Sequence, residues 1–287
     1  MFPLVDTKDA TAVASFVAEK FAGMYPGAST TWLHVLFCEI EELFTGQRPD
    51  YAAIDLRYHD LEHTLQATVC LSLLLQGRHR AGDEPRLGPR DFELALSAVL
   101  LHDTGYLKLR SDQSGTGAKY TYCHVLRSCA FAASYLPTLG AEDHEIDIVL
   151  NAINCTGPTK EIRHLACPEP VCAVIGSALG TADYLGQMAA PDYPDELDSL
   201  YNEFLEADEF VHRPVARRAF KSAADLIERT PAFWKTFVRE KIEGEFHAMY
   251  RYLAHPYPHG PNAYLDAVEA NIAEIARRIA GPTAAVS

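Results

Sequence analysis

Residues 91–106 read DFELALSAVLLHDTGY, an apolar helical pattern that ends in the adjacent pair His102-Asp103. The following Thr104-Gly105 interrupts that pattern. Burying an imidazole and a carboxylate together is costly unless the two groups pair with each other or bind a metal ion. We therefore expect a helix that ends either in a metal-binding pair or in a histidine that interacts with the helix dipole beside a capping aspartate.

Two further segments place histidine or aspartate within helical patterns. Residues 58–63 read YHDLEH, in which His59 and His63 are four residues apart and share one helix face. Residues 175–189 read IGSALGTADYLGQMA, in which Asp183 interrupts small and apolar residues. A mixed set of imidazoles and carboxylates suits a divalent cation such as Mn, Fe, Co, Zn or Mg. The three segments together predict a metal site.

Helical patterns also cover the rest of the chain, and no convincing strand alternation bounded by hairpin turns is present. The sequence therefore predicts a compact all-α bundle of many helices. We expect helices over residues 7–24, 29–44, 61–76, 89–103, 120–136, 141–154, 168–189, 196–207, 215–229, 232–252 and 263–279.

The chain has 287 residues, of which 48% are hydrophobic, so it can bury a full-sized core. We predict one helical domain over 1–287, with a core at about 55–190, N-terminal helices over 1–54 and a C-terminal helical extension over 191–287. The formal charge of −14 is spread along the chain, which argues against a nucleic-acid polymer as a partner. It is compatible with a small phosphorylated substrate, because a bound cation reverses the local charge.

The sequence also bears on the compartment. The seven cysteines form no Cys-x-x-Cys pair, and several lie in apolar stretches, so we expect reduced thiols that pack as small core residues. No signal peptide is recognisable, and no apolar run reaches the roughly 18 residues that a membrane span needs. These features predict a cytoplasmic protein without a membrane partner; a homodimer is left open.

The ordered set His63, His102-Asp103 and Asp183 resembles the H…HD…D pattern of the HD-superfamily metal-dependent phosphohydrolases. The similarity covers about residues 55–190. It implies an HD-domain bundle in which these four residues hold a divalent metal ion and Asp103 is able to bridge to a second ion. The implied reaction is hydrolysis of a phosphate ester by a metal-activated water.

The YHDLEH segment is also similar to the YHNxxH segment of the cyclic-nucleotide phosphodiesterase branch. That similarity implies that His59 is the general acid that protonates the leaving oxygen; a surface histidine paired with Asp60 or Glu62 is the alternative. The chain departs from the branch at Asp60, where the branch has Asn, and at Thr104-Gly105-Tyr106, where the branch carries a further histidine. The departures concern cyclic-nucleotide specificity and leave the metal ligands unchanged.

Five more residues are candidates for supporting the site. His124 begins a predicted helix and could orient a water or bind a second ion, or could simply lie at the helix start. Arg127 could bind a phosphate oxygen and Lys108 could attract an anion, although both could equally be solvated. Thr156, in a segment that resembles the IxxT stretch of phosphodiesterase-like domains, could support a metal ligand. Gln187, one turn after Asp183, could hydrogen-bond the substrate or lie on the surface.

These observations predict a metal-dependent phosphohydrolase acting on a phosphomonoester, a nucleotide or a small cyclic phosphodiester. One alternative is an HD-type ligand-binding or regulatory domain without turnover. Another, less favoured, is an HD-fold di-iron oxygenase, which needs additional histidine ligands. Only His124, His144 and His164 are available for that role, and His144, in the acidic stretch AEDHEID, and His164, in a polar loop, do not look like ligands. The sequence does not identify the substrate, the native metal or the role of residues 192–287.

Overall fold

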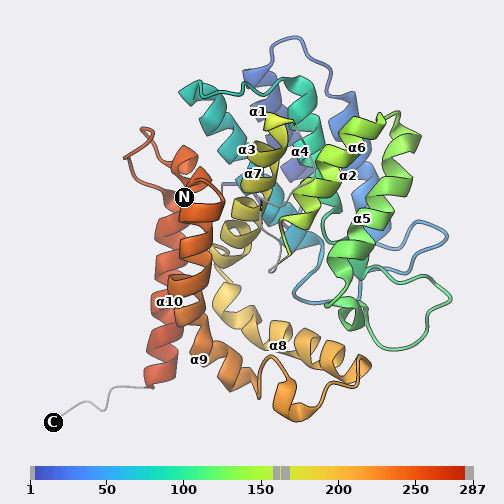
Figure 1. The fold of residues 1–287 in the computed structure, drawn as a ribbon, viewed down its shortest axis with the longest axis vertical. Coiled ribbons are helices and arrows are strands. Elements are labelled where there is room, and N and C mark those ends of the chain that lie inside the picture. Colours follow the sequence, from blue (N-terminus) through green and yellow to red (C-terminus); the bar gives the residue numbers. More distant parts are fainter. Residues whose placement is uncertain (1–3, 158–161, 163–168, 282–287) are drawn as a thin grey trace.

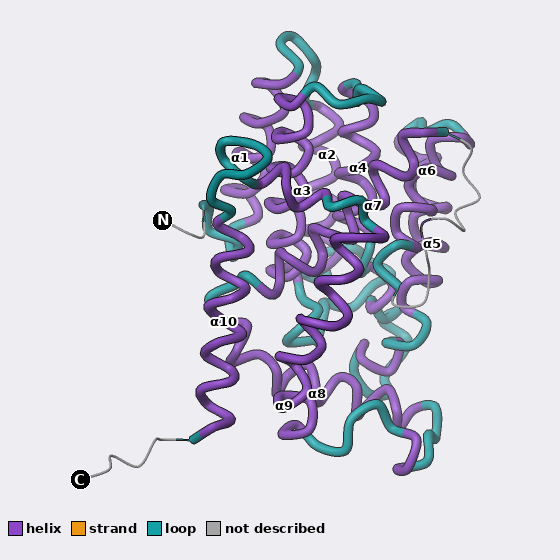
Figure 2. Tube along the Cα trace, turned by 60° about the vertical axis from the view of Figure 1, so that its left-hand side comes forward, coloured by secondary structure: helices purple, strands orange, loops and turns teal. Residues whose placement is uncertain are grey.

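The computed structural model describes residues 4–157, 162 and 169–281, and within them the chain folds into ten α-helices without a β-strand (Figures 1 and 2). The all-α prediction is therefore confirmed. The helices are α1 (Ala10–Met24), α2 (Thr31–Phe44), α3 (Leu61–Ala81), α4 (Pro89–Leu101), α5 (His124–Tyr135), α6 (Asp143–Asn154), α7 (Pro170–Met188), α8 (Tyr193–Phe210), α9 (Ala223–Phe233) and α10 (Ala263–Ala280).

The centre of the bundle is the pair α3 and α7, which pack more extensively than any other two helices described (Figure 1). Both helices are buried on several sides, as expected for helices that are apolar around most of their circumference. Their crossing is close because Gly186 has no side chain: a Cβ atom there would lie 2.8 Å from the Cα of Ala67. This crossing brings residues of α3 and α7 to one central site.

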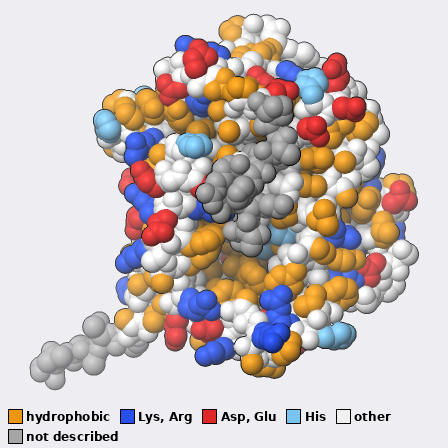
Figure 3. Space-filling model, viewed as in Figure 1, with side chains coloured by type: hydrophobic (Ala, Val, Ile, Leu, Met, Phe, Trp, Pro, Cys, Tyr) orange, Lys and Arg blue, Asp and Glu red, His pale blue; other side chains and the backbone are white. Residues whose placement is uncertain are grey.

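The C-terminal third of the chain covers one side and one end of this centre. α10 and the segment that follows α9 form a column beside α7, and α8 crosses below them in the view of Figure 1. On this face, hydrophobic side chains line a hollow below the residues drawn in grey (Figure 3). In this position α8 packs against the 3₁₀ turn Gly117–Tyr120, which belongs to the predicted core.

Three predicted boundaries were wrong. Helix α3 does not end at Gln76 but continues through Gly77 to Ala81. Gly77 serves close packing instead of ending the helix, because a Cβ atom at this position would lie 1.9 Å from the carbonyl oxygen of Tyr252. The predicted helix 215–229 is a short 3₁₀ turn followed by α9, which begins after the capping residue Ser222. The predicted helix 232–252 divides into π-helical turns and a 3₁₀ turn.

The cysteines only partly follow the prediction. Within the described residues, Cys38, Cys70, Cys123, Cys129 and Cys155 are free thiols. Cys172 is disulfide-bonded, so the expectation of reduced cysteines throughout is wrong. Cys167 and His164 lie outside the described residues. Among the helices that the structure describes, none combines the length and the apolar composition needed to cross a membrane.

Candidate metal centre

The four predicted ligands come from three helices that meet at the bundle centre. His63 lies in the first turn of α3, where the side chain of Asp60 accepts a hydrogen bond from its backbone N–H at 3.0 Å. His102 follows the last residue of α4, and Asp103 comes where the chain leaves that helix. Asp183 lies in the second half of α7. The termination of α4 explains how two adjacent residues can face the same point.

The side chains of these four residues converge. One donor atom from each of His63, His102 and Asp103 lies within 4.8 Å of the others, and all three residues are buried. The Oδ1 atom of Asp183 lies 3.3 Å from Nε2 of His63 and 3.6 Å from Nε2 of His102. The Oδ2 atom of Asp103 lies 3.2 and 3.3 Å from the same two nitrogens. This cluster could hold a metal ion.

The ring of His102 is oriented as a metal ligand would be. Its Nδ1 lies 2.7 Å from the carbonyl oxygen of Val99, so Nδ1 carries the hydrogen and Nε2 is an acceptor in the neutral ring. Nε2 and the facing Oδ2 of Asp103 are both buried without a hydrogen bond of acceptable geometry. Two buried acceptors that face each other require a positive charge between them.

The charges of the cluster point the same way. Burial lowers the pKa of His63, but the carboxylates of Asp103 and Asp183, 3.2 and 3.3 Å from its Nε2, outweigh burial and raise that pKa to about 10. The pKa of His102 is likewise raised by the two carboxylates against the effect of burial. Burial would raise the pKa of Asp103 and Asp183, yet the histidines hold both well below the usual range. The two buried carboxylates therefore recruit positive charge, either protons or a cation.

The ring of His59 lies beside this cluster and is held by Glu203. The ring centroids of His59 and His63 are 5.4 Å apart. Nδ1 of His59 lies 2.6 Å from Oε2 of Glu203, and Oε1 of Glu203 accepts the backbone N–H of Tyr58 at 2.8 Å. Glu203 is buried in α8. This contact leaves Nε2 as the ring nitrogen of His59 that is free for a substrate.

His124 lies beside both His59 and Tyr106. The rings of His59 and His124 each stack on the ring of Tyr106, with centroid distances of 4.7 and 4.5 Å, and their own centroids are 6.3 Å apart. Nδ1 of His124 lies 2.7 Å from the carbonyl of Thr121, and burial lowers the pKa of the ring. A neutral His124 therefore turns the lone pair of Nε2 toward Oδ1 of Asp103, 3.8 Å away.

Gln187 contacts Asp183, one of the predicted metal ligands, rather than the surface. Its amide nitrogen donates to Oδ1 of Asp183 at 3.3 Å and to the carbonyl of the same residue at 2.9 Å. Its amide oxygen accepts a hydrogen bond from the hydroxyl of Tyr58. Gln187 thus fixes the orientation of Asp183, and its amide is already occupied by these contacts.

The structure places the remaining candidates away from the cluster. Arg127 donates to the carbonyls of Gly105 and Leu107 at 2.6 and 2.8 Å, so it supports the turn that follows Asp103. Lys108 forms an ion pair with Asp55 at 2.8 Å. Thr156 donates to the carbonyl of Ile153 at 2.8 Å, which is a local helix-end contact. His144 is exposed and faces Glu142.

Glu203, Tyr58 and Tyr106 were missed as parts of the site. A signal for Glu203 was present, because Leu197, Glu203 and Ala207 are buried on one face of α8 and a carboxylate among them is unusual. Nothing in the sequence indicated that its partner would be His59. The pairing depends on where α8 crosses the bundle.

Comparison with known proteins adds no identification. No protein-family model matches the chain, and a search of curated proteins found no significant match.

Proposed function

We propose that the chain is a metal-dependent phosphohydrolase that cleaves a phosphate ester of a small molecule. The observation that supports it most directly is the pair of unsatisfied acceptors, Nε2 of His102 and Oδ2 of Asp103, within a buried set of two imidazoles and two carboxylates. The choice of a phosphate ester rests on the H…HD…D order of these residues, which resembles that of HD-superfamily phosphohydrolases.

The residues present fit a divalent metal ion. His63, His102, Asp103 and Asp183 would hold it, and the ion would supply Lewis-acid polarisation of the phosphoryl group and a lowered pKa of water. An ion with histidine and carboxylate donors is consistent with Mn, Fe, Co, Zn or Mg. Oδ1 of Asp103 and Nε2 of His124 face each other as two further acceptors, which is consistent with a second ion.

His59 is suited to hold a proton for the leaving oxygen. Glu203 accepts a hydrogen bond from Nδ1 and fixes the ring, so Nε2 is the nitrogen that would carry the proton for the leaving oxygen. Release of that proton to an alkoxide would complete cleavage of the phosphorus–oxygen bond. Glu203 then retains the ring in the same orientation for reprotonation by solvent.

The test is metal analysis combined with a substrate screen. Protein purified without a chelator is analysed for bound metal, then assayed with aryl phosphomonoesters, aryl phosphodiesters, nucleotides and cyclic nucleotides in the presence of Mn, Mg, Co or Zn. We expect bound metal and phosphate-ester cleavage that a chelator abolishes and a metal restores.

Two outcomes would contradict the proposal. Bound metal without cleavage of any ester would favour a ligand-binding domain or, with two irons per chain and oxygen consumption, an oxygenase. Absence of metal after exposure to each of these ions would remove the basis of the site itself.

A further inference from the structure

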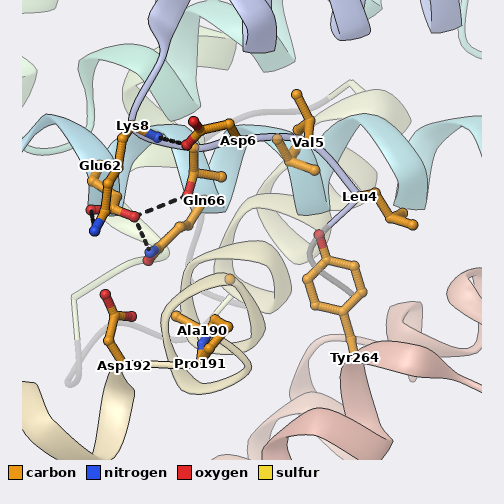
Figure 4. Close-up of a pocket in the computed structure, with 13 residues that line it drawn as sticks. Leu4, Val5, Asp6, Lys8, Glu62, Gln66, Ala190, Pro191, Asp192 and Tyr264 are labelled. Atoms are coloured by element: carbon orange, nitrogen blue, oxygen red, sulfur yellow. Dashed lines mark hydrogen bonds and ion pairs between the residues drawn. The ribbon is translucent and has the colours of Figure 1, made fainter. Parts of the chain in front are cut away.

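A cavity lies at the opposite end of α3 from His63, away from the candidate metal centre, and has no part in the proposed reaction. Its volume is about 470 Å³, which falls in the range of small-molecule sites. Its walls come from the last turns of α3, the segment 252–257 and the start of α10. Leu4 and Tyr264 line both this cavity and a neighbouring one. Figure 4 draws the neighbouring cavity and shows these two side chains next to each other.

The cavity is built by defined contacts. Gly77 allows the backbone of Tyr252 to pack directly on α3. The loop that follows is closed by hydrogen bonds from the backbone N–H of His255 to the carbonyl of Pro261 at 3.0 Å and from that of Gly260 to the carbonyl of Pro256 at 2.7 Å. The rings of Tyr252 and Tyr257 are stacked with centroids 5.0 Å apart. The hydroxyl of Tyr252 also donates to Asp83 just beyond α3.

The described residues that line the cavity are mostly apolar, and their only formal charge is the positive charge of an arginine. Leu73, Leu253, Ala254 and the tyrosine rings supply apolar surface. Arg80 is the only lysine, arginine, aspartate or glutamate among the lining residues described. Its side chain is exposed and makes no hydrogen bond or ion pair with the described residues. Asp83 lies nearby, but its carboxylate accepts hydrogen bonds from the hydroxyls of Tyr252 and Tyr257.

We propose that this cavity is a binding site for a small amphiphilic anion. The apolar body, aromatic or aliphatic, lies between Leu73 and Tyr252, and a carboxylate or sulfonate group pairs with Arg80. The positive charge of Arg80 stands at the rim of an apolar cavity in a chain whose formal charge of −14 otherwise repels anions. A cation at the rim of an apolar cavity gives such a ligand both affinity and orientation.

The experiment uses the full chain and the fluorescent probe anilinonaphthalene sulfonate, which combines an aromatic body with one sulfonate. We expect saturable binding with a blue-shifted emission and competition by decanoate. Arg80→Glu should weaken binding of the probe about tenfold or more, because an ion pair is replaced by repulsion. Ala263→Trp should abolish it by filling the cavity from its exposed rim at the first residue of α10.

The matched control for charge is Arg217→Glu, an exposed arginine in the turn Val215–Arg217 without a described ion-pair partner. This variant should bind the probe like the wild type. Circular dichroism melts of all variants establish that each is folded. Equal affinity of the wild type, Arg80→Glu and Ala263→Trp would overturn the proposal, as would a signal that does not saturate. Metal content and phosphate-ester cleavage should be unchanged in Arg80→Glu, so the outcome of the probe-binding experiment is independent of the proposed reaction.

Discussion

Oε2 of Glu203 lies 2.6 Å from Nδ1 of His59, although 144 residues separate them in the chain. The glutamate comes from α8, and the histidine immediately precedes the start of α3. The second oxygen of the same carboxylate holds the backbone of Tyr58, so the ring and the chain that carries it are fixed together. The positioning of the proposed general acid therefore comes from the C-terminal part of the chain.

The first prediction concerns this contact. Glu203→Gln should retain metal but lower kcat about tenfold to a hundredfold, because the ring of His59 loses the carboxylate that orients it. Steady-state kinetics, with metal analysis of the same samples, would measure both effects.

The control for that variant is Glu206→Gln, one turn later on α8. Glu206 accepts hydrogen bonds from Thr116 rather than from a histidine. Its replacement should affect stability and leave kcat unchanged. If the two variants had the same kcat, Glu203 would be a structural residue only.

The second prediction concerns the metal ligands. Asp103→Ala should reduce bound metal to a background level, because Oδ2 of this residue lies next to Nε2 of both His63 and His102. Asp208→Asn is a suitable control, since Asp208 is equally buried but pairs with Arg213 and Tyr122. Elemental analysis of the two purified variants decides the matter. Normal metal content in Asp103→Ala would show that the cluster is not the site.

The third prediction concerns pH and the metal-free fold. The pKa of His63 is raised from 6.5 to about 10, so its protonated form stabilises the folded state fully below pH 6.5. That contribution is lost as the pH rises toward 10. Chelator-treated protein should therefore lose thermal stability between about pH 6.5 and 8.5, below the range in which buried thiols and tyrosines titrate. Metal-loaded protein, in which the imidazole binds without its proton, should change little. Parallel curves for the two forms would contradict this account.

The fourth prediction tests the crossing that creates the site. Gly186→Ala should destabilise the fold by about 1–3 kcal/mol, because the added methyl would lie 2.8 Å from the backbone of α3 at Ala67. Gly244→Ala is the control, since a Cβ at Gly244 would meet no atom within 4 Å. Denaturant unfolding should show no loss of stability for Gly244→Ala. An equal loss in both variants would mean that the close approach of α3 and α7 does not cause the effect.

The sequence was sufficient to predict the all-α class and the convergence of His63, His102 and Asp103, for a physical reason. His63, His102 and Asp183 interrupt apolar helix faces, and such interruptions are visible without a structure. Their convergence follows once the helices pack. The role of Arg127 was not predictable in this way, because the carbonyls of Gly105 and Leu107 need donors only in the turn that the chain adopts. Gly77 was misread as a helix end, since its close neighbour Tyr252 is remote in sequence.

The two glutamates of α8 have a practical consequence. Glu203 holds the segment before α3, and Glu206 holds Thr116 in the loop before α5. A fragment trimmed to residues 55–190 would keep all four proposed metal ligands but lose both of these attachments. Any attempt to define a minimal active fragment by limited proteolysis or truncation should therefore retain α8 to Phe210. Cleavage before that helix should separate metal binding from turnover.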